Sequence, residues 1–171
     1  AESLVEIAAK HNLTLMVNHT FVYTGAVRKM REIVQHGDLG DLYYFDSVRI
    51  NLGLIQRDIN VLWDLAPHDI AILDHLVDEP PASICANGAC HIGNGIENVA
   101  YLTVYFNSGL VAHFHNNWLA PVKIRTVIVG AVLPTFDIAL GGPRLLHSVV
   151  GAGVVMVVIM LGTRHRRILR R

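Results

Sequence analysis

The stretch ENVAYLTVYFNSGLVAHFHNNW at residues 97–118 decides the fold class. Two runs rich in β-branched and aromatic residues, 97–106 and 109–118, flank Asn107-Ser108-Gly109, which is typical of a tight turn. Similar runs stand before and after it, at 83–91 and 123–129. The pattern predicts consecutive strands arranged as an antiparallel meander.

Two segments upstream of these strands have the spacing of helices. Residues 25–36 are followed by Gly37, the residue type expected just past a helix end, and residues 63–77 are followed by Pro80-Pro81. A long β-rich run, 42–52, lies between them. Their expected inward faces are Val27, Met30, Ile33 and Val34 in the first helix and Leu65, Ile70, Leu73 and Leu76 in the second. We therefore expect an α+β fold, in which an open, mainly antiparallel sheet carries helices on one face.

The N-terminal residues have a different pattern. Residues 2–11 predict a helix and Leu13–Val17 a short apolar strand, which together resemble the last step of a parallel α/β sheet. A chain of 171 residues is long enough for one domain with a real core. We expect residues 1–18 to be a remnant of a parallel α/β domain, 19–130 to be the α+β domain, and 131–171 to be an atypical tail.

Charge and hydropathy set this tail apart. The chain has zero net charge, which gives no global attraction to nucleic acid. Residues 1–130 hold 8 Lys+Arg and 13 Asp+Glu, whereas 131–171 hold 6 Arg and a single acid, Asp137. Residues 145–162 are almost wholly apolar and precede five arginines, a pattern compatible with a marginal membrane span. The alternative is that residues after about 130 are foreign to the domain, as in a frame-shifted end, and the charge inversion favours it.

Cysteine and metal signals are weak. Cys85 and Cys90 fit neither a zinc ribbon nor a disulfide framework, so we expect free thiols and a cytoplasmic protein. His113 and His115 face the same way along a strand, but no third ligand is evident, and we expect no metal site. The glycines at 93 and 95 stand between two strands, where a hairpin turn is expected instead of a phosphate loop.

Asp64 and His68 form the clearest candidate for chemistry. They stand four residues apart at the start of a predicted helix, so their side chains share a face. A carboxylate can orient an imidazole and raise its basicity while the ring takes a proton from a substrate hydroxyl. From spacing alone, a helix-capping aspartate and a solvated or core histidine remain open as the alternative.

Three motifs extend this reading. The segment LMVNHTFVY at 15–23, followed by AVRK at 26–29, is similar to the segment that joins the two domains of the Gfo/Idh/MocA oxidoreductases. DLAPHD at 64–69 resembles the active-site Asp-x-x-x-His motif of that family, and the surrounding NLG and DINVLWD resemble its branch acting on nucleotide-linked sugars. The resemblance covers residues 13–130.

The resemblance implies the remaining assignments. His68 would be the acid/base near the reacting sugar carbon and Asp64 its partner. The substrate side would include Arg57, Asn60, Trp63 and His19. A guanidinium at position 57 suits a phosphate or carboxylate.

The cofactor expectation also follows from the family. The intact enzyme would use NAD or NADP for hydride transfer. The resemblance implies that residues 1–18 are a remnant of the family's Rossmann-type dinucleotide-binding domain. The family's glycine-rich loop and Glu-Lys-Pro segment belong upstream of Ala1, so we expect this chain to be a truncated fragment that binds no cofactor tightly and is inactive alone. The expected partners are a sugar or nucleotide-sugar substrate and further copies of the chain through the sheet face. A non-catalytic oligomerisation domain and a tail-anchored membrane protein remain as alternatives.

Overall fold

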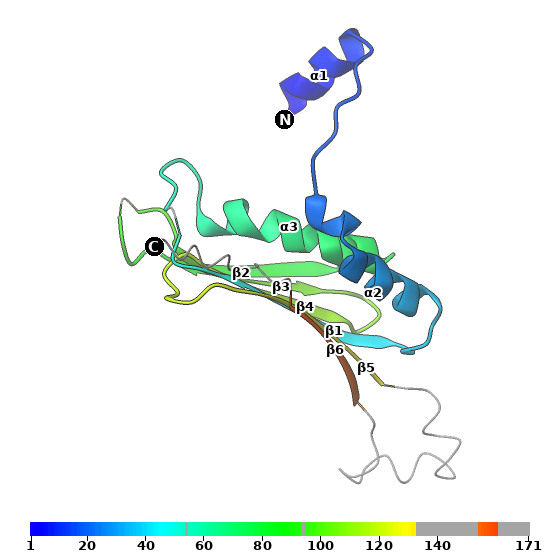
Figure 1. The fold of residues 1–171 in the computed structure, drawn as a ribbon. Helices are drawn as coiled ribbons and strands as arrows, with labels where there is room; N and C mark the ends of the chain where they lie inside the picture. Colours follow the sequence, from blue (N-terminus) through cyan, green and yellow to red (C-terminus); the bar gives the residue numbers. More distant parts are fainter. Residues whose placement is uncertain (54, 94, 133–153, 161–171) are drawn as a thin grey trace, which may run out of the picture.

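One layer of helices and one sheet make up the main body of the protein (Figure 1). The computed structural model describes residues 1–53, 55–93, 95–132 and 154–160. The elements in chain order are α1 (Glu2–Lys10), η1 (Thr20–Tyr23), α2 (Gly25–Gln35), β1 (Leu42–Ile50), α3 (Val61–Leu76), β2 (Ser83–Ala89), β3 (Val99–Tyr105), β4 (Val111–Asn117), β5 (Ile124–Val132) and β6 (Val154–Met160). The predicted α+β architecture, with helices on one face of an open sheet, is confirmed.

The strand order differs from a simple meander. The sheet runs β2-β3-β4-β1-β5-β6, so only β2, β3 and β4 follow one another as hairpin-connected neighbours. β1 lies between β4 and β5, parallel to β4 and antiparallel to β5. The predicted meander over residues 83–129 is therefore wrong at its last strand. The position beside β4 is already filled by β1, an early strand whose pairing is non-local and leaves no local sequence signal.

The core lies between the helices and the sheet. The face of β1 that carries Phe45 packs against α2 and α3, because alternate side chains of a strand point to the same side. Val27 and Met30 are buried as predicted, and so are Leu73 and Leu76. The residues of the main cluster are Val27, Met30, Phe45, Ile72, Leu73, Leu76, Leu102, Val104, Phe106, Leu110, Ala112, Phe114, Val127 and Val129.

The inward face of α3 is rotated from the predicted one. Ile70 is exposed, whereas its neighbour Asp69 is buried. The apolar pattern alone places an aspartate outside, and a buried ion pair, described below, reverses that preference. Pro67 also lies inside α3 and removes one helical N–H donor, so the carbonyl of Trp63 lacks its usual partner within the helix.

The N-terminal segment behaves as predicted only in part. α1 forms, but none of its residues is buried, and Figure 1 shows it apart from the helical layer, joined by an extended segment. Leu13–Val17 does not form the predicted strand. A helix makes its hydrogen bonds within itself, whereas a strand needs a neighbouring strand. The described part of the chain offers this segment no such neighbour.

The sheet continues past the predicted boundary at residue 130. Gly130 lies under the ring of Tyr44, so close that a Cβ at this position would overlap the aromatic carbons. β5 then runs on to Val132 and pairs with β6. Residues 133–153 and 161–171 lie outside the described residues.

β6 bears on the membrane-span alternative for residues 145–162. That interpretation required a helix, but the portion the structure describes, Val154–Met160, is a strand paired antiparallel with β5. Among the described helices, none has the length and apolar character to cross a bilayer.

Candidate active site

The first turn of α3 is held in place by Asn60. The side-chain oxygen of Asn60 accepts a hydrogen bond from the Trp63 backbone N–H at 3.0 Å, and its amide nitrogen donates to Glu97 at 3.1 Å. Asparagine is among the best residues for capping a helix start. Asn60, which the family resemblance places on the substrate side, therefore caps α3 and joins it to the segment before β3.

Asp64 is held one turn later. Its Oδ2 accepts a hydrogen bond from the indole Nε1 of Trp118 at 3.1 Å, and Trp118 is fully buried. Among the described hydrogen bonds, none joins Asp64 to His68. The carboxylate is thus oriented by the tryptophan, and within this arrangement it influences His68 through its charge.

His68 lies half-buried on the same helix. Its ring meets the edge of Phe21, with ring centroids 5.3 Å apart, and its buried Nδ1 has no hydrogen-bond partner among the described residues. Burial lowers the pKa of His68, and the charge of Arg49 lowers it further. The charge of Asp69 raises this pKa in part, and Asp64 does so more weakly. The net direction keeps the imidazole neutral near pH 7, the form that accepts a proton.

A buried ion pair stands directly beside His68. Arg49 of β1 donates to Asp69 of α3 through Nε at 2.8 Å and through Nη2 at 2.5 Å, and both side chains are only 2% exposed. The guanidinium also lies over the ring of Phe21, 4.5 Å from its centroid. A two-pronged contact of this kind holds the two groups in one orientation. Through these two contacts, Arg49 links β1 to α3 and to η1 next to His68.

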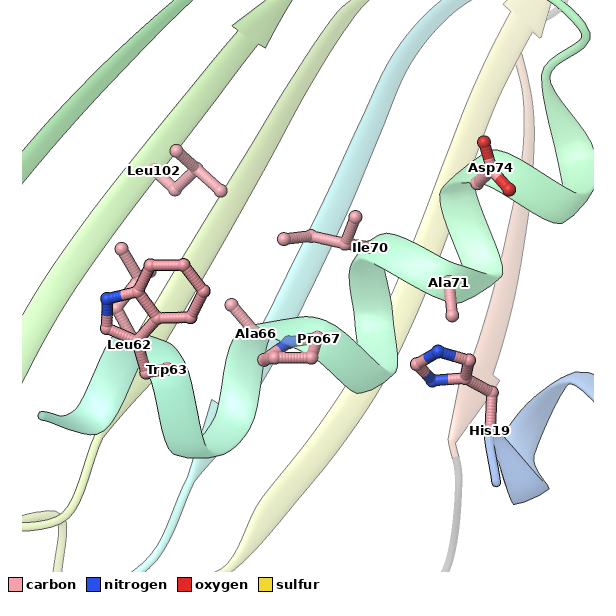
Figure 2. A pocket seen from close by; sticks show the side chains of 9 residues that line it. All are labelled: His19, Leu62, Trp63, Ala66, Pro67, Ile70, Ala71, Asp74 and Leu102. Atoms are coloured by element: carbon pink, nitrogen blue, oxygen red, sulfur yellow. The ribbon is translucent and has the colours of Figure 1, made fainter. Parts of the chain in front are cut away.

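His19 and Trp63 line a cavity beside α3. The cavity has a volume of about 440 Å³. Figure 2 shows its side chains arranged along α3, with His19 reaching in beside η1. The lining residues are His19, Leu62, Trp63, Ala66, Pro67, Ile70, Ala71, Asp74 and Leu102. His68 is not among these lining residues, but its neighbour Pro67 is, and His19 lies close enough for its charge to lower the pKa of His68.

The structure therefore brings together part of the predicted site. Arg57 is exposed in the loop before α3, with no described hydrogen bond or ion pair. Three further residues influence His68 but were not predicted as site residues. Phe21 packs against its ring, and the charges of Arg49 and Asp69 alter its pKa. One signal was available for Arg49, because it stands two and four residues after Ser47 and Phe45 on one strand face.

Two weaker candidates lie on or beside the sheet. His113 and His115 both stack on Tyr101, at centroid distances of 6.0 Å and 4.6 Å. Within the described ranges, no group of His, Cys, Asp or Glu side chains is arranged to hold a metal ion. Gly93 and Gly95 have positive φ angles of 108° and 88°, as expected of turn residues, and they lie between β2 and β3.

Comparison with known families agrees with this architecture. Residues 27–131 match the model of the GFO/IDH/MocA C-terminal domain, which is more than half of the chain. No curated protein matches the chain.

Solved structures share the fold at low sequence identity. The WlbA dehydrogenase from Bordetella pertussis, in complex with NADH and UDP-GlcNAcA, is 15% identical with a TM-score of 0.66, covering 77% of this chain and 46% of its own. The UDP-N-acetylglucosamine 3-dehydrogenase GnnA from Acidithiobacillus ferrooxidans is 22% identical with a TM-score of 0.61, covering 77% and 44%. A putative NADPH-dependent oxidoreductase from Desulfitobacterium hafniense is 15% identical with a TM-score of 0.64, covering 92% and 52%. The chain spans about half the length of these proteins.

Proposed function

The chain belongs to the GFO/IDH/MocA family, and from this premise we propose that it is the substrate domain of an NAD(P)-dependent oxidoreductase acting on a sugar or nucleotide sugar. Its structural neighbours include dehydrogenases of nucleotide sugars. The observation that carries the proposal is the half-buried His68 with a lowered pKa and an unpartnered Nδ1, on a helix anchored to the sheet by the Arg49–Asp69 ion pair.

The proposed chemistry is the oxidation of a sugar CH–OH carbon to a ketone, or the reverse. In the oxidation, the carbon loses a hydride and the hydroxyl loses its proton, so the C–O bond becomes a double bond. Bound NAD(P)⁺ supplies the hydride acceptor. His68 takes the hydroxyl proton as a general base, because its neutral imidazole is available at neutral pH.

The neighbours of His68 assist in separate ways. Asp64 and Asp69 contribute negative charge that stabilises the imidazolium formed when the proton arrives. The Arg49–Asp69 pair keeps α3 in register with β1, so His68 is held at one position. Arg49 opposes the protonated form through its own charge, so the imidazole is kept from being protonated before substrate arrives.

The described residues fit only one end of the cofactor. The cavity beside His19 and Trp63 has mostly apolar walls, against which a flat nicotinamide ring can pack. No glycine-rich turn between a strand and a helix start, the usual site for a pyrophosphate, occurs in the described ranges. We therefore assign the substrate side of the reaction to this chain and expect its own affinity for NAD(P) to be weak.

Two further parts of the proposal concern partners. Arg57 is exposed close to the start of α3, where its guanidinium can meet a phosphate of a nucleotide sugar. Tyr101 and His115 lie on the sheet face opposite the core residues Leu102 and Phe114, because successive side chains of a strand alternate between faces. Figure 1 shows the helices on one face of the sheet, so in the described part of the chain the other face has no helix over it. We propose this face as the surface of a homo-oligomer.

The test is nucleotide-sugar binding by the full chain. Isothermal titration with UDP-GlcNAcA and UDP-GlcNAc is expected to give saturable binding, with UDP alone binding more weakly. His68→Asn is expected to weaken sugar-nucleotide binding several-fold, since one hydrogen bond is worth about 1 kcal/mol. His75→Asn, on the same helix but away from Phe21, serves as the control. The proposal is contradicted if neither UDP-GlcNAcA nor UDP-GlcNAc binds. It is also contradicted if His68→Asn and His75→Asn weaken binding equally.

A further inference from the structure

No hydrogen bond to a described residue fixes the orientation of the His68 ring at its buried nitrogen. The buried Nδ1 has no partner within the described ranges. Asp64, one helical turn earlier, accepts from the indole of Trp118 at 3.1 Å instead. A carboxylate or carbonyl that accepts from Nδ1–H is a common way to orient an imidazole. In this chain the orientation must come from what packs against the ring.

Phe21 is the aromatic neighbour that packs there. The centroids of the Phe21 and His68 rings are 5.3 Å apart, and their planes meet at 73°, an edge-to-face arrangement. Aromatic rings favour this geometry because the positive edge of one ring meets the negative face of the other. The last side-chain torsion of histidine is otherwise broad, so a ring packed against the imidazole restricts its rotation. The contact also covers part of the imidazole and so contributes to its burial.

Phe21 is itself held at its ring and at its backbone. The guanidinium of Arg49 lies over the ring, 4.5 Å from its centroid, and Asp69 fixes that guanidinium through two hydrogen bonds. The carbonyl of Phe21 accepts from the Thr24 hydroxyl at 2.7 Å and from the Thr24 N–H at 3.1 Å. Thr24 also caps α2, since its hydroxyl accepts from the Val27 N–H at 3.5 Å. The ring is thereby fixed to β1 and the backbone to α2.

We infer that Phe21 is a positioning residue, whose ring fixes the orientation of the His68 imidazole in place of a hydrogen bond to Asp64. This inference rests on the proposed function, which assigns the proton transfer to His68. It leaves Asp64 as a charge that Trp118 holds one helical turn away. Because Phe21 belongs to η1, the orientation of the base on α3 is set by a different element of the chain.

Phe21 and Asp64 act on the pKa of His68 in opposite directions. Burial, to which the phenyl ring contributes, is the main cause that lowers this pKa, whereas the charge of Asp64 raises it. Loss of the ring should therefore raise the pKa, and loss of the Asp64 charge should lower it. The charged and titratable groups that face His68 are Arg49 on β1, Asp64 and Asp69 on α3, and His19 before η1.

NMR titration of the full chain without ligand separates the two effects. Phe21→Leu keeps an apolar side chain but removes the ring, and is expected to raise the pKa of His68 toward the ordinary value of about 6.5. Phe21→Tyr restores the ring and is expected to return the pKa to that of the unsubstituted chain. Asp64→Asn is expected to lower it. Phe106→Leu alters another aromatic residue of the core and controls for a loss of stability, so it should leave the pKa of His68 unchanged.

Several results would overturn the inference. The pKa of His68 could stay unchanged in Phe21→Leu, fail to return in Phe21→Tyr, or rise equally in Phe106→Leu. A rise in Asp64→Asn would mean that the carboxylate orients the ring. A nuclear Overhauser contact between the Phe21 and His68 rings is expected in the unsubstituted chain, and its absence contradicts the inference even where a variant does not fold. If the pKa values respond as expected but UDP-GlcNAcA and UDP-GlcNAc do not bind, the proposed function fails while the positioning by Phe21 is upheld.

Discussion

Residues 1–17 and residues 27–131 are both rich in apolar side chains, but the two regions differ in how far these side chains are buried. Leu4 and Val17 are 57% and 71% exposed, whereas Val27 and Met30 are 1% and 3% exposed. α1 and α2 are each amphipathic, but only α2 has a sheet to pack on. The comparison shows that an apolar pattern specifies which face can be buried, and that a packing partner determines whether it is.

Within residues 27–131, helix α3 is joined to the sheet by an ion pair as well as by apolar contacts. Asp69 places a carboxylate inside the core, and Arg49 neutralises it there. The N-terminal segment has no equivalent link within the described residues. Mutations at the two regions should therefore have very different consequences.

The largest effect is expected at the buried pair. Asp69→Ala leaves Arg49 charged and unpaired, which should lower the free energy of unfolding by about 3–5 kcal/mol. Asp74→Ala, an exposed position on the same helix, is the control and should change little. Urea unfolding of the full chain measures both, and a similar loss in the two variants would refute the anchoring by this pair.

A smaller effect is expected at the start of α3. Asn60→Ala removes the cap on the Trp63 N–H and the contact with Glu97, and should cost about 1 kcal/mol. Asn60→Ser keeps an oxygen that can accept from the helix start and should recover most of this loss. If serine and alanine are equally destabilising, the cap is not the reason that Asn60 matters.

The histidines should make stability depend weakly on pH. The pKa values of His68, His75 and His115 are all lowered, in each case mainly by burial. The unfolded chain therefore takes up protons first as the pH falls below about 6.5. Stability should be complete above that pH and decline as the pH falls through the lower folded-state values. The loss should be modest because these side chains are only partly buried, and thermal melts from pH 8 to pH 5 should follow it. Melts that stay constant or improve toward pH 5 would contradict the lowered pKa values.

The smallest effect is expected in α1. Leu4→Ser and Val5→Ser change exposed side chains and should leave the unfolding free energy of the 27–131 region unchanged within about 0.5 kcal/mol. The same substitution at the buried Val27 is the contrasting control. A large loss from Leu4→Ser would mean that the N-terminal segment packs on the domain after all.

The sequence was sufficient for the elements that depend on local signals. The helix spacing, the turn at Asn107-Ser108-Gly109 and the β-rich runs predicted the helices and strands with small differences at their ends. The position of β1 between β4 and β5 was not predictable, because the pairing of Arg49 with Arg125 joins distant parts of the chain. The strand at 13–17 was predicted from composition, but a strand also needs a partner.

The candidate site was likewise predictable where a local motif marked it, but its contacts between distant parts of the chain were not. The motif around Asp64 and His68 pointed to one helix, and that helix carries a half-buried imidazole. The motif did not predict that Asp64 would bind Trp118 or that Asn60 would cap the helix. Nor did it predict Phe21, because an aromatic residue gives no sign in sequence of the charges that will surround it.

The most direct test is an NMR titration of His68 in the full chain, with and without a saturating nucleotide sugar. We expect the pKa of His68 to lie below that of an ordinary histidine in the free chain. The ring signals of His68 should shift when the sugar binds, while those of His75 should not. An ordinary or raised pKa, together with ring signals that do not respond to the sugar, would contradict the claim that His68 is the base.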